Sequence, residues 1–304
     1  MSGSLRRPSA LRPGDRVALL APSGRIQASS LDAAVGRLRA AGLEPVVYPS
    51  ARARGDVRAY LAGTDEQRAA DLVDALLDPS IRGILCGRGG YGAQRVLEHL
   101  DWSRLAEVEP TVVVGYSDVT ALHEAVATQL GWASLHGPLV ASNVPPDDVS
   151  WESLLTALMA PDAFRLRFPS ARALVGGRAS GVTVGGNLAM LTSSLGTPTS
   201  RPARGGLLLL EDVGEDDYRV DRMLTQLRRS GYLAGVAGIV AGSWLDCPGA
   251  EPVLTERLGD LGVPLLLGAD VGHAGPNLTF PLGVEATLDA DAGTVTLAEP
   301  PLVP

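Results

Sequence analysis

Ser117 stands at the junction between an apolar run and a helical pattern in "TVVVGYSDVTALHEAV", residues 111–126. One interpretation is that Ser117 or Asp118 caps the helix. The other is that Ser117 is a nucleophile on a tight turn, toward which the helix start directs free backbone N–H groups. The stretch is not a G-x-S-x-G nucleophile elbow, because Val119 replaces the last glycine. Ser117 by itself leaves both interpretations open.

A nucleophilic serine requires a general base, and the chain contains four histidines. His273 is the best candidate, because it lies in a Gly/Pro-rich loop, "ADVGHAGPN", directly after an apolar strand pattern. Such loops, held on a rigid scaffold, often carry catalytic groups. His136 ends a short strand-like run and could line the site or bind a backbone group. His99 and His123 lie inside helical patterns, where roles other than chemistry are expected.

The base in turn needs a group that orients it, and Glu211 fits that role. It follows four leucines in "GGLLLLEDVGEDDYRVDRML", so it is the one acid of this stretch that adjoins a buried strand. The neighbouring acids are typical of a solvated loop and a helix N-terminus: Asp212, Glu215, Asp216 and Asp217. A metal site is disfavoured there, because no histidine or cysteine lies nearby.

A second glycine-rich element, "CGRGGYGAQRVL", follows another apolar strand pattern. Gly87, Gly89 and Gly92 match G-x-G-x-x-G, which would indicate dinucleotide binding. The element is not in the first strand–helix unit, however, and no acid ends a second strand ~20 residues further on to bind a ribose. Alternatively, Gly89 and Gly90 let backbone N–H groups approach a substrate oxyanion.

The elements that must position these residues change character along the chain. Residues 1–140 alternate strand and helix patterns, and their all-apolar strands are typical of a parallel sheet covered on both faces. Residues 141–180 are rich in proline, glycine and acids and predict a linker with one helix near 151–159. Residues 181–304 predict a second domain that ends in a hairpin around 291–293.

Two helices have clear local patterns. Thr64 and Gln67 have the spacing of a capping box ahead of an amphipathic segment. The helix that begins near Tyr218 carries an apolar stripe at i, i+3, i+4 and i+7, which predicts a core face rather than a cofactor site: Val220, Met223, Leu224 and Leu227.

Composition excludes several classes of protein. The 304 residues carry a net charge of −8 and only 4% aromatic residues, which disfavours nucleic-acid binding. The chain lacks the ~18-residue apolar run of a membrane helix and a signal peptide, so a cytoplasmic location is expected. Cys86, expected to be buried, and Cys247 lack zinc-like spacing. We therefore expect neither a metal nor a cofactor.

Five motifs together resemble one family. "GRGGYG", "GYSDVTAL", "LHGP", "LLLLEDVGEDDYRVDRML" and "GHAGPNLTFPLG" occur in the order and approximate spacing of the LD-carboxypeptidase family of serine peptidases. The resemblance covers nearly the whole chain. It implies an α/β fold with a Rossmann-like N-terminal domain, a smaller β-rich C-terminal domain and an active site in the cleft between them. It also implies a homodimer.

The resemblance assigns a Ser-Glu-His triad to this sequence. Ser117 would be the nucleophile, His273 the base and Glu211 the residue that orients the base. Backbone N–H groups of Gly90 and Asp118 would stabilise the oxyanion. The serine would thus come from one domain and its two partners from the other.

The resemblance also implies a small peptide substrate. Most members of the family release the terminal D-alanine of an L-Ala-D-Glu-diaminopimelate-D-Ala tetrapeptide during peptidoglycan recycling. A microcin-type branch instead cuts an amide between an aminoacyl or peptidyl group and a nucleotide. Tyr91 and Asn187, which lie in glycine-rich settings, are expected to line the cleft. A dinucleotide-binding module remains a further alternative.

Overall fold

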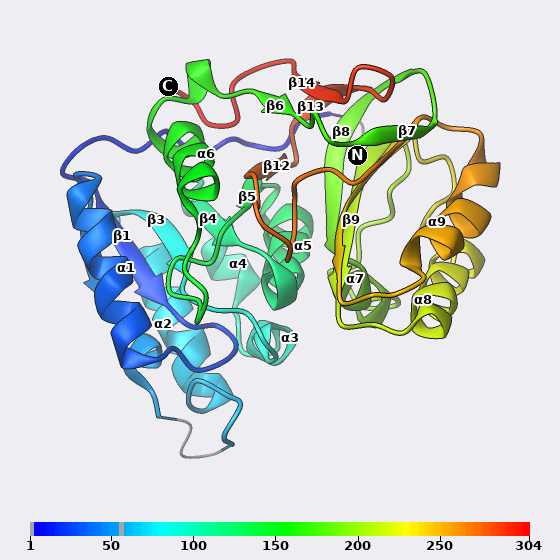
Figure 1. Ribbon diagram of the computed structural model, residues 1–304. Coiled ribbons are helices and arrows are strands. Elements are labelled where there is room, and N and C mark those ends of the chain that lie inside the picture. Colours follow the sequence, from blue (N-terminus) through cyan, green and yellow to red (C-terminus); the bar gives the residue numbers. More distant parts are fainter. Residues whose placement is uncertain (1–2, 55–57) are drawn as a thin grey trace.

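The computed structural model describes residues 3–54 and 58–304 and has two lobes that lie side by side (Figure 1). The first lobe is built on a six-stranded sheet with the order β12-β5-β4-β3-β1-β2. The five strands that come first in the chain are parallel, as their apolar patterns predict. They are β1 (Arg16–Leu20), β2 (Glu44–Val47), β3 (Ile81–Cys86), β4 (Val112–Gly115) and β5 (Ser134–His136).

Helices connect these parallel strands, as crossovers between parallel strands require. They are α1 (Ala28–Ala40), α2 (Asp65–Leu77), α3 (Ala93–Leu97), α4 (Trp102–Leu105) and α5 (Thr120–Ala125). The capping box at the start of α2 is confirmed. The Gln67 N–H donates to Thr64 Oγ1 at 3.2 Å, and the Thr64 N–H donates to Gln67 Oε1 at 3.0 Å.

The second lobe is built on an eight-stranded sheet with the order β6-β14-β13-β8-β9-β10-β11-β7. Its central strands are parallel: β8 (Arg178–Asn187), β9 (Gly206–Val213), β10 (Gly238–Leu245) and β11 (Leu265–Leu267). Antiparallel strands flank them: β6 (Leu166–Arg167), β7 (Arg172–Val175), β13 (Glu285–Asp289) and β14 (Thr294–Leu297). The hairpin expected around 291–293 joins β13 to β14.

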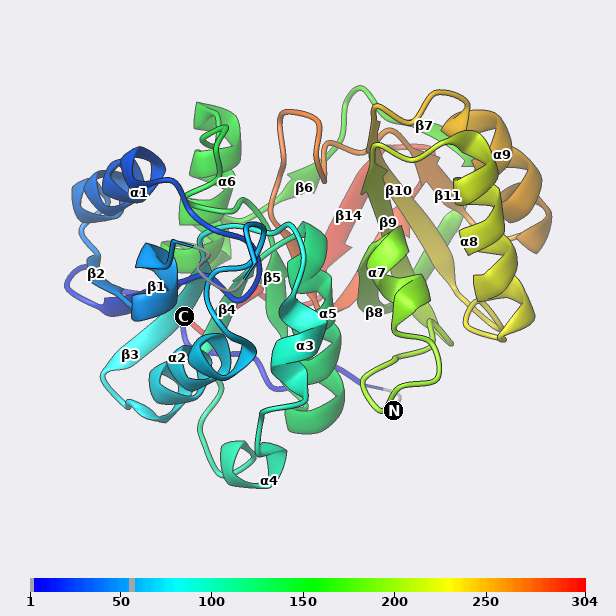
Figure 2. The same ribbon diagram turned by 90° about the horizontal axis from the view of Figure 1, so that it is seen from below.

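Three helices accompany the second sheet: α7 (Leu188–Ser193), α8 (Asp217–Arg229) and α9 (Ala250–Leu258). Figure 2 shows α8 and α9 next to each other at the outer side of this lobe. The apolar stripe of α8 faces the core as expected. Val220, Leu224 and Leu227 are fully buried, and Met223 packs against the same cluster.

The segment 141–180 contains α6 (Asp148–Met159), which starts three residues before the expected helix because Asp147 caps it. The same segment supplies β6, β7 and the first residues of β8 to the second sheet. The strand β12 (Phe280–Leu282) instead returns to the first sheet, where it pairs antiparallel with β5. Because strands cross between the sheets in this way, the sheets do not define where one domain ends and the next begins. The domain boundaries at 140 and 181 stay predictions.

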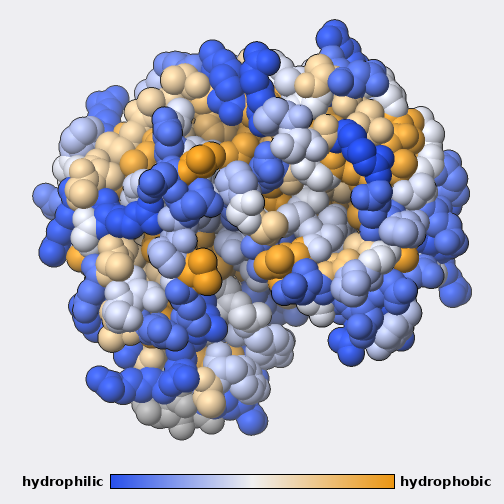
Figure 3. Space-filling view, in the orientation of Figure 1, coloured by the Kyte–Doolittle hydropathy of each residue, from blue (hydrophilic) through white to orange (hydrophobic). Residues whose placement is uncertain are grey.

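The two lobes also share core. One hydrophobic cluster contains residues from both sheets, such as Leu135 on β5, Leu209 on β9 and Phe280 on β12. The helices α5 and α7, one from each lobe, lie against each other (Figure 2). The face in Figure 3 is mostly hydrophilic, with hydrophobic residues in small separate groups. Throughout the described residues, every helix is too short or too polar to cross a bilayer.

Candidate active site

The backbone at Ser117 has an uncommon conformation. Its φ is +63°, and in the described chain only Asp246 is another non-glycine residue with positive φ. Such a left-handed conformation costs a β-carbon-bearing residue roughly 1–3 kcal/mol and tends to occur at functional sites. A short 3₁₀ turn, Ser117–Val119, leads from the serine into α5. Neither the Ser117 nor the Asp118 side chain caps this helix, so the capping interpretation is not supported.

The glycine-rich loop after β3 packs directly against this turn. A β-carbon added to Gly89 would lie 3.1 Å from Ser117 Cβ and 3.2 Å from its Oγ, so the loop approaches closely because Gly89 has no side chain. The Asp118 carboxylate joins the two segments by accepting a hydrogen bond of 2.7 Å from the Ala93 N–H. Gly90 has a φ of +105°. Among the loop and side-chain hydrogen bonds of residues 3–54 and 58–304, neither Gly90 N nor Asp118 N serves as a donor.

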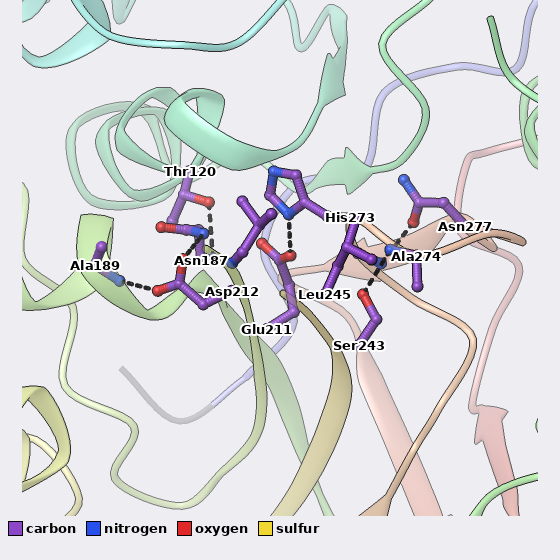
Figure 4. Close-up of polar contacts among 12 residues, drawn as sticks. Thr120, Asn187, Ala189, Glu211, Asp212, Ser243, Leu245, His273, Ala274 and Asn277 are labelled. Carbon is purple, nitrogen blue, oxygen red and sulfur yellow. Dashed lines mark hydrogen bonds and ion pairs between the residues drawn. The ribbon is translucent and has the colours of Figure 1, made fainter. Parts of the chain in front are cut away.

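Glu211 and His273 meet at the carboxyl ends of the parallel strands of the second lobe. His273 Nδ1 donates to Glu211 Oε2 at 2.6 Å (Figure 4). This contact leaves the opposite ring nitrogen, Nε2, as the acceptor of a neutral imidazole. The Glu211 side chain is fully buried, whereas that of His273 is 14% exposed. An imidazole with one oriented nitrogen and some solvent access can act as a general base.

The charge of Glu211 follows from its surroundings. Burial alone would raise its pKa, but the imidazoles of His136 and His273 outweigh burial and lower the pKa to about 2. His136 Nε2 lies 3.9 Å from Glu211 Oε1, and both side chains are fully buried. Glu211 is thus a carboxylate at neutral pH and lies between two imidazoles.

Side chains of the second lobe hold the loop that carries His273. Ser243 Oγ accepts a hydrogen bond of 3.0 Å from the Ala274 N–H, and Asn277 Oδ1 accepts one of 2.9 Å from the Gly272 N–H (Figure 4). Gly272 has a φ of +117°, and an added β-carbon there would lie 2.6 Å from the carboxylate that binds the imidazole. Only glycine lets the loop and the carboxylate come this close.

Tyr116, the residue before Ser117, packs against His273. Its ring centre is 4.7 Å from that of His273 in an edge-on arrangement. Burial, and secondarily the Glu211 carboxylate, raise the pKa of Tyr116 to about 12, so the phenol is neutral. Tyr116 and His273 line one pocket of about 370 Å³, to which both lobes contribute. Within the described residues, no hydrogen bond links Ser117 directly to His273.

Comparisons with known proteins match this two-lobed arrangement. Residues 17–137 match the profile of the LD-carboxypeptidase N-terminal domain, and residues 180–288 match that of the LD-carboxypeptidase C-terminal domain. The chain belongs to the LD-carboxypeptidase family. A putative carboxypeptidase of Streptomyces coelicolor is 51% identical over 98% of each chain. The murein tetrapeptide carboxypeptidase of Pseudomonas aeruginosa is 34% identical over 91% of this chain and 94% of that protein.

Solved structures show the same fold. A muramoyltetrapeptide carboxypeptidase from Oxalobacter formigenes is 28% identical, with a TM-score of 0.80, over 93% of this chain and 97% of that one. The microcin self-immunity protein MccF, in complex with aspartyl sulfamoyl adenosine, is 25% identical with a TM-score of 0.88, over 97% and 99% of the two chains. The mixed α/β fold with two lobes and the serine carboxypeptidase class are therefore established for this family member.

In this LD-carboxypeptidase a buried arginine organises the glycine-rich loop, which sequence reasoning missed. The Arg68 side chain on α2 is fully buried and donates to the carbonyl of Pro22 and, at 2.8 Å, to that of Gly92. It also pairs with Asp65. Pro22 and Gly92 lie on the loops after β1 and β3, so Arg68 joins two loops at one edge of the sheet. The only local signal was an arginine on the core side of an amphipathic helix.

Asn187 and Tyr91, the two residues expected to contact substrate, differ in how far other side chains and backbone groups already bind them. The Asn187 amide is engaged at both ends, because Oδ1 accepts from the Met190 N–H at 3.1 Å and Nδ2 donates to Asp212 Oδ1 at 3.0 Å (Figure 4). Asn187 thereby caps α7. Tyr91 is 50% exposed, and its ring packs edge-on against Tyr60. Contact with substrate stays a prediction for both residues.

The remaining histidines behave as structural groups. His123 is buried, with Nδ1 2.9 Å from Ser134 Oγ and Nε2 2.8 Å from the Gly115 carbonyl oxygen. Burial lowers its pKa to about 3, so it is neutral and supports the backbone just before the serine turn. His99 is exposed at the surface. Cys86 is buried as expected, and burial raises the pKa of its thiol to about 12.

Proposed function

We propose that this LD-carboxypeptidase works through a triad of Ser117, His273 and Glu211. The observation that carries the proposal is the 2.6 Å hydrogen bond from His273 Nδ1 to a fully buried, ionised Glu211. A carboxylate in this position selects the imidazole tautomer whose free nitrogen can accept a proton. The strained backbone of Ser117 adds support, because the preceding residue, Tyr116, packs against the imidazole ring.

The reaction divides into two acyl-transfer steps. His273 Nε2 takes the proton of Ser117 Oγ as the oxygen attacks the peptide carbonyl carbon. The tetrahedral oxyanion is stabilised by the backbone N–H groups of Gly90 and Asp118, which donate no loop hydrogen bond within residues 3–54 and 58–304. The imidazolium then protonates the leaving amine, and water hydrolyses the acyl-enzyme with the same imidazole as base. The direct serine–imidazole hydrogen bond would form when substrate binds, as is common in such sites.

We further propose the terminal D-alanine of murein tetrapeptides as the leaving group, in peptidoglycan recycling. The name of the Pseudomonas aeruginosa relative supports this substrate. A cytoplasmic location and a homodimeric state belong to the same proposal.

A second candidate substrate is an amide between an aminoacyl or peptidyl group and a nucleotide. It is favoured by the fold of MccF, which was solved with aspartyl sulfamoyl adenosine. Chromatographic analysis of products from both substrates distinguishes the two candidates. Calorimetric titration with NAD and NADP tests the dinucleotide alternative that the glycine-rich loop raised.

The triad is tested with Ser117→Ala. Loss of the nucleophile is expected to lower kcat for D-alanine release by up to ~10⁶-fold. Ser170→Ala is the matched control, because Ser170 is an exposed serine on the turn between β6 and β7. Folding is checked by circular dichroism. A Ser117→Ala protein that keeps the wild-type rate would rule out this serine as nucleophile.

A further inference from the structure

A second pocket lies at the edge of the first sheet where its parallel strands end. Its volume is about 460 Å³, and it is lined by residues from the loops that follow β1, β2 and β3. In the order β5-β4-β3-β1-β2, the chain changes direction between β1 and β3. Open parallel sheets bind ligands at such a switch point, outside the carboxyl ends of the strands. The pocket is therefore where this kind of sheet is expected to hold a ligand.

Arginines dominate the lining of this pocket. Arg25 follows β1, Arg52 and Arg54 follow β2, and Arg88 follows β3. Three of these side chains are exposed and Arg88 is half-buried. Four like charges around one pocket repel each other unless an anion is bound between them. This concentration contrasts with the net charge of −8 of the whole chain.

The contacts of the arginines hold the loops, and within the described residues these contacts are with carbonyl oxygens and not with acids. Arg88 donates to the Arg25 carbonyl oxygen at 2.7 Å, and Arg25 donates to the Arg54 carbonyl oxygen at 3.0 Å. In the segments 3–54 and 58–304, no carboxylate forms an ion pair with any of the four. Arg52 makes no side-chain hydrogen bond within these segments either. Guanidinium groups in this state are suited to bind a carboxylate or phosphate through paired N–H groups.

The start of α1 adds to the positive potential. Ala28, the first residue of this 13-residue helix, lines the pocket, and the preceding Gln27 makes no side-chain capping bond. The first turn of α1 contains no acid. Its free backbone N–H groups and the partial positive charge of the helix start therefore favour an anion on the same side as the arginines.

The loop after β3 contributes one residue to the pocket and the next residue to the contact with the serine. Arg88 precedes Gly89, which packs against Ser117. Gly24 lies on the other side of this contact: its N–H donates to the Gly89 carbonyl oxygen at 2.9 Å, and a β-carbon added to it would lie 3.8 Å from Arg88 Nε. The loop residues 88–89 thus connect the lining of the pocket to the serine turn.

We propose that this arginine pocket, defined by Arg25, Arg52, Arg54 and Arg88, is an anion subsite that binds a carboxylate or phosphate group of the substrate remote from the cleaved bond. The inference rests on the proposed function, because it takes Ser117 as the point of cleavage. A murein tetrapeptide offers the free carboxylate of its D-glutamate, and a nucleotide amide offers a phosphate. The volume of about 460 Å³ accommodates a group of either size.

Binding is measured by calorimetry in a Ser117→Ala background, so that turnover does not interfere. The probes are the L-Ala-D-Glu-diaminopimelate-D-Ala tetrapeptide, the same peptide with the D-glutamate carboxyl amidated, and AMP. Arg52→Gln and Arg88→Gln are each expected to weaken binding of the acidic peptide by about 10- to 100-fold, the effect of losing one charged hydrogen bond. The same variants are expected to bind the amidated peptide as the parent does.

Arg39→Gln is the matched control. Arg39 is exposed in the last turn of α1, ~17 Å along the helix from its start. The substitution therefore removes one positive charge from the same lobe without changing the lining of the pocket. Circular dichroism and thermal melting check that each variant folds.

The outcomes separate the subsite from the proposed activity. Weaker binding of AMP in the arginine variants, with unchanged peptide binding, supports the anion subsite and assigns it to a phosphate. Arginine variants that bind the acidic peptide and AMP as tightly as Arg39→Gln overturn the subsite. If binding depends on the arginines but the protein with Ser117 intact releases no D-alanine, the proposed peptidase activity is refuted and the subsite is retained.

Discussion

The Glu211 carboxylate is buried away from water, and the imidazoles of His136 and His273 lie next to it. The lowered pKa of about 2 shows that they stabilise the carboxylate by more than burial destabilises it. Its hydrogen bond to His273 Nδ1 favours the imidazolium that forms during catalysis. At the scale of single residues, the proposed chemistry therefore depends on a negative charge that has no contact with solvent.

Replacing that charge tests its contribution. Glu211→Gln keeps the size of the side chain but removes the charge that stabilises the imidazolium. We expect kcat/KM for D-alanine release to fall by about 10³- to 10⁴-fold. Steady-state kinetics measure the change, with the exposed Glu256→Gln on α9 as control. A fall of less than tenfold would contradict an orienting role for Glu211.

Glu124 is a buried acid of the opposite kind. Burial raises its pKa from 4.5 to about 8, although a 2.8 Å hydrogen bond from the Arg201 N–H opposes the shift. The folded protein therefore keeps a proton that the unfolded chain releases above pH 4.5. This group makes the free energy of unfolding fall as the pH rises from 4.5 to about 8.

Glu124→Gln is expected to remove this pH dependence, because the amide does not titrate. Urea unfolding of both proteins from about pH 5 to about pH 8 measures the effect. The wild-type protein should lose more stability over that range than the variant. Two curves that run parallel would show that Glu124 does not titrate in this window.

At the scale of elements, the site depends on the close approach of two loops. The turn after β4 carries Ser117, and the loop after β3 packs against it at Gly89. The buried Arg68 joins the second loop to the loop after β1. Because these contacts fix backbone segments rather than side chains, small changes in loop position should affect the reaction more than the stability.

Gly89→Ala tests this approach. The added methyl group would lie 3.1 Å from Ser117 Cβ, so the serine turn or the loop has to move. A displacement of about 1 Å at a reacting group costs on the order of 10²-fold in rate. We expect a loss of kcat of that size with little change in urea midpoint.

Gly36→Ala is the control for this substitution. Gly36 lies inside α1, where no atom beyond the helix's own backbone and the adjacent residues lies within 4 Å of an added β-carbon. Alanine there should raise the free energy of unfolding by about 1 kcal/mol and leave kcat unchanged. If Gly89→Ala behaves like Gly36→Ala, the close packing at Ser117 has no role in activity.

At the scale of the whole molecule, the lobes exchange strands. The chain leaves the first sheet after β5, builds most of the second, returns to the first as β12 and then adds β13 and β14 to the second. Phe280 on β12 is fully buried in the cluster that contains residues of both sheets. The proposed triad is divided between lobes that are joined in this way, so its geometry depends on a single connected core.

Phe280→Ala tests whether the lobes unfold together. Loss of this buried ring is expected to lower the free energy of unfolding by about 3–5 kcal/mol. Hydrogen exchange should show amides of β1 and β9 losing protection to the same degree, since one core supports both sheets. Loss confined to one sheet would contradict a shared core and show that each lobe unfolds by itself.

Much of this organisation could be predicted from local patterns. The apolar strands of the first half, the capping box at Thr64 and the stripe on α8 depend on neighbours in the chain, and all three are confirmed. Five ordered motifs were enough to indicate the family, which the profile matches confirm. Local propensity and periodicity act over a few residues, so the printed sequence contains their full cause.

Only the tertiary structure decided which distant segments of the chain are in contact. The contact of Gly89 with Ser117 and the position of Arg68 between two loops each require segments that are distant in the chain to meet. The same holds for the 62-residue separation of Glu211 from His273, whose hydrogen bond forms only when β9 and the later loop are packed side by side. Residue types show which groups could react, but the packing of sheets and loops determines which groups are within hydrogen-bonding distance.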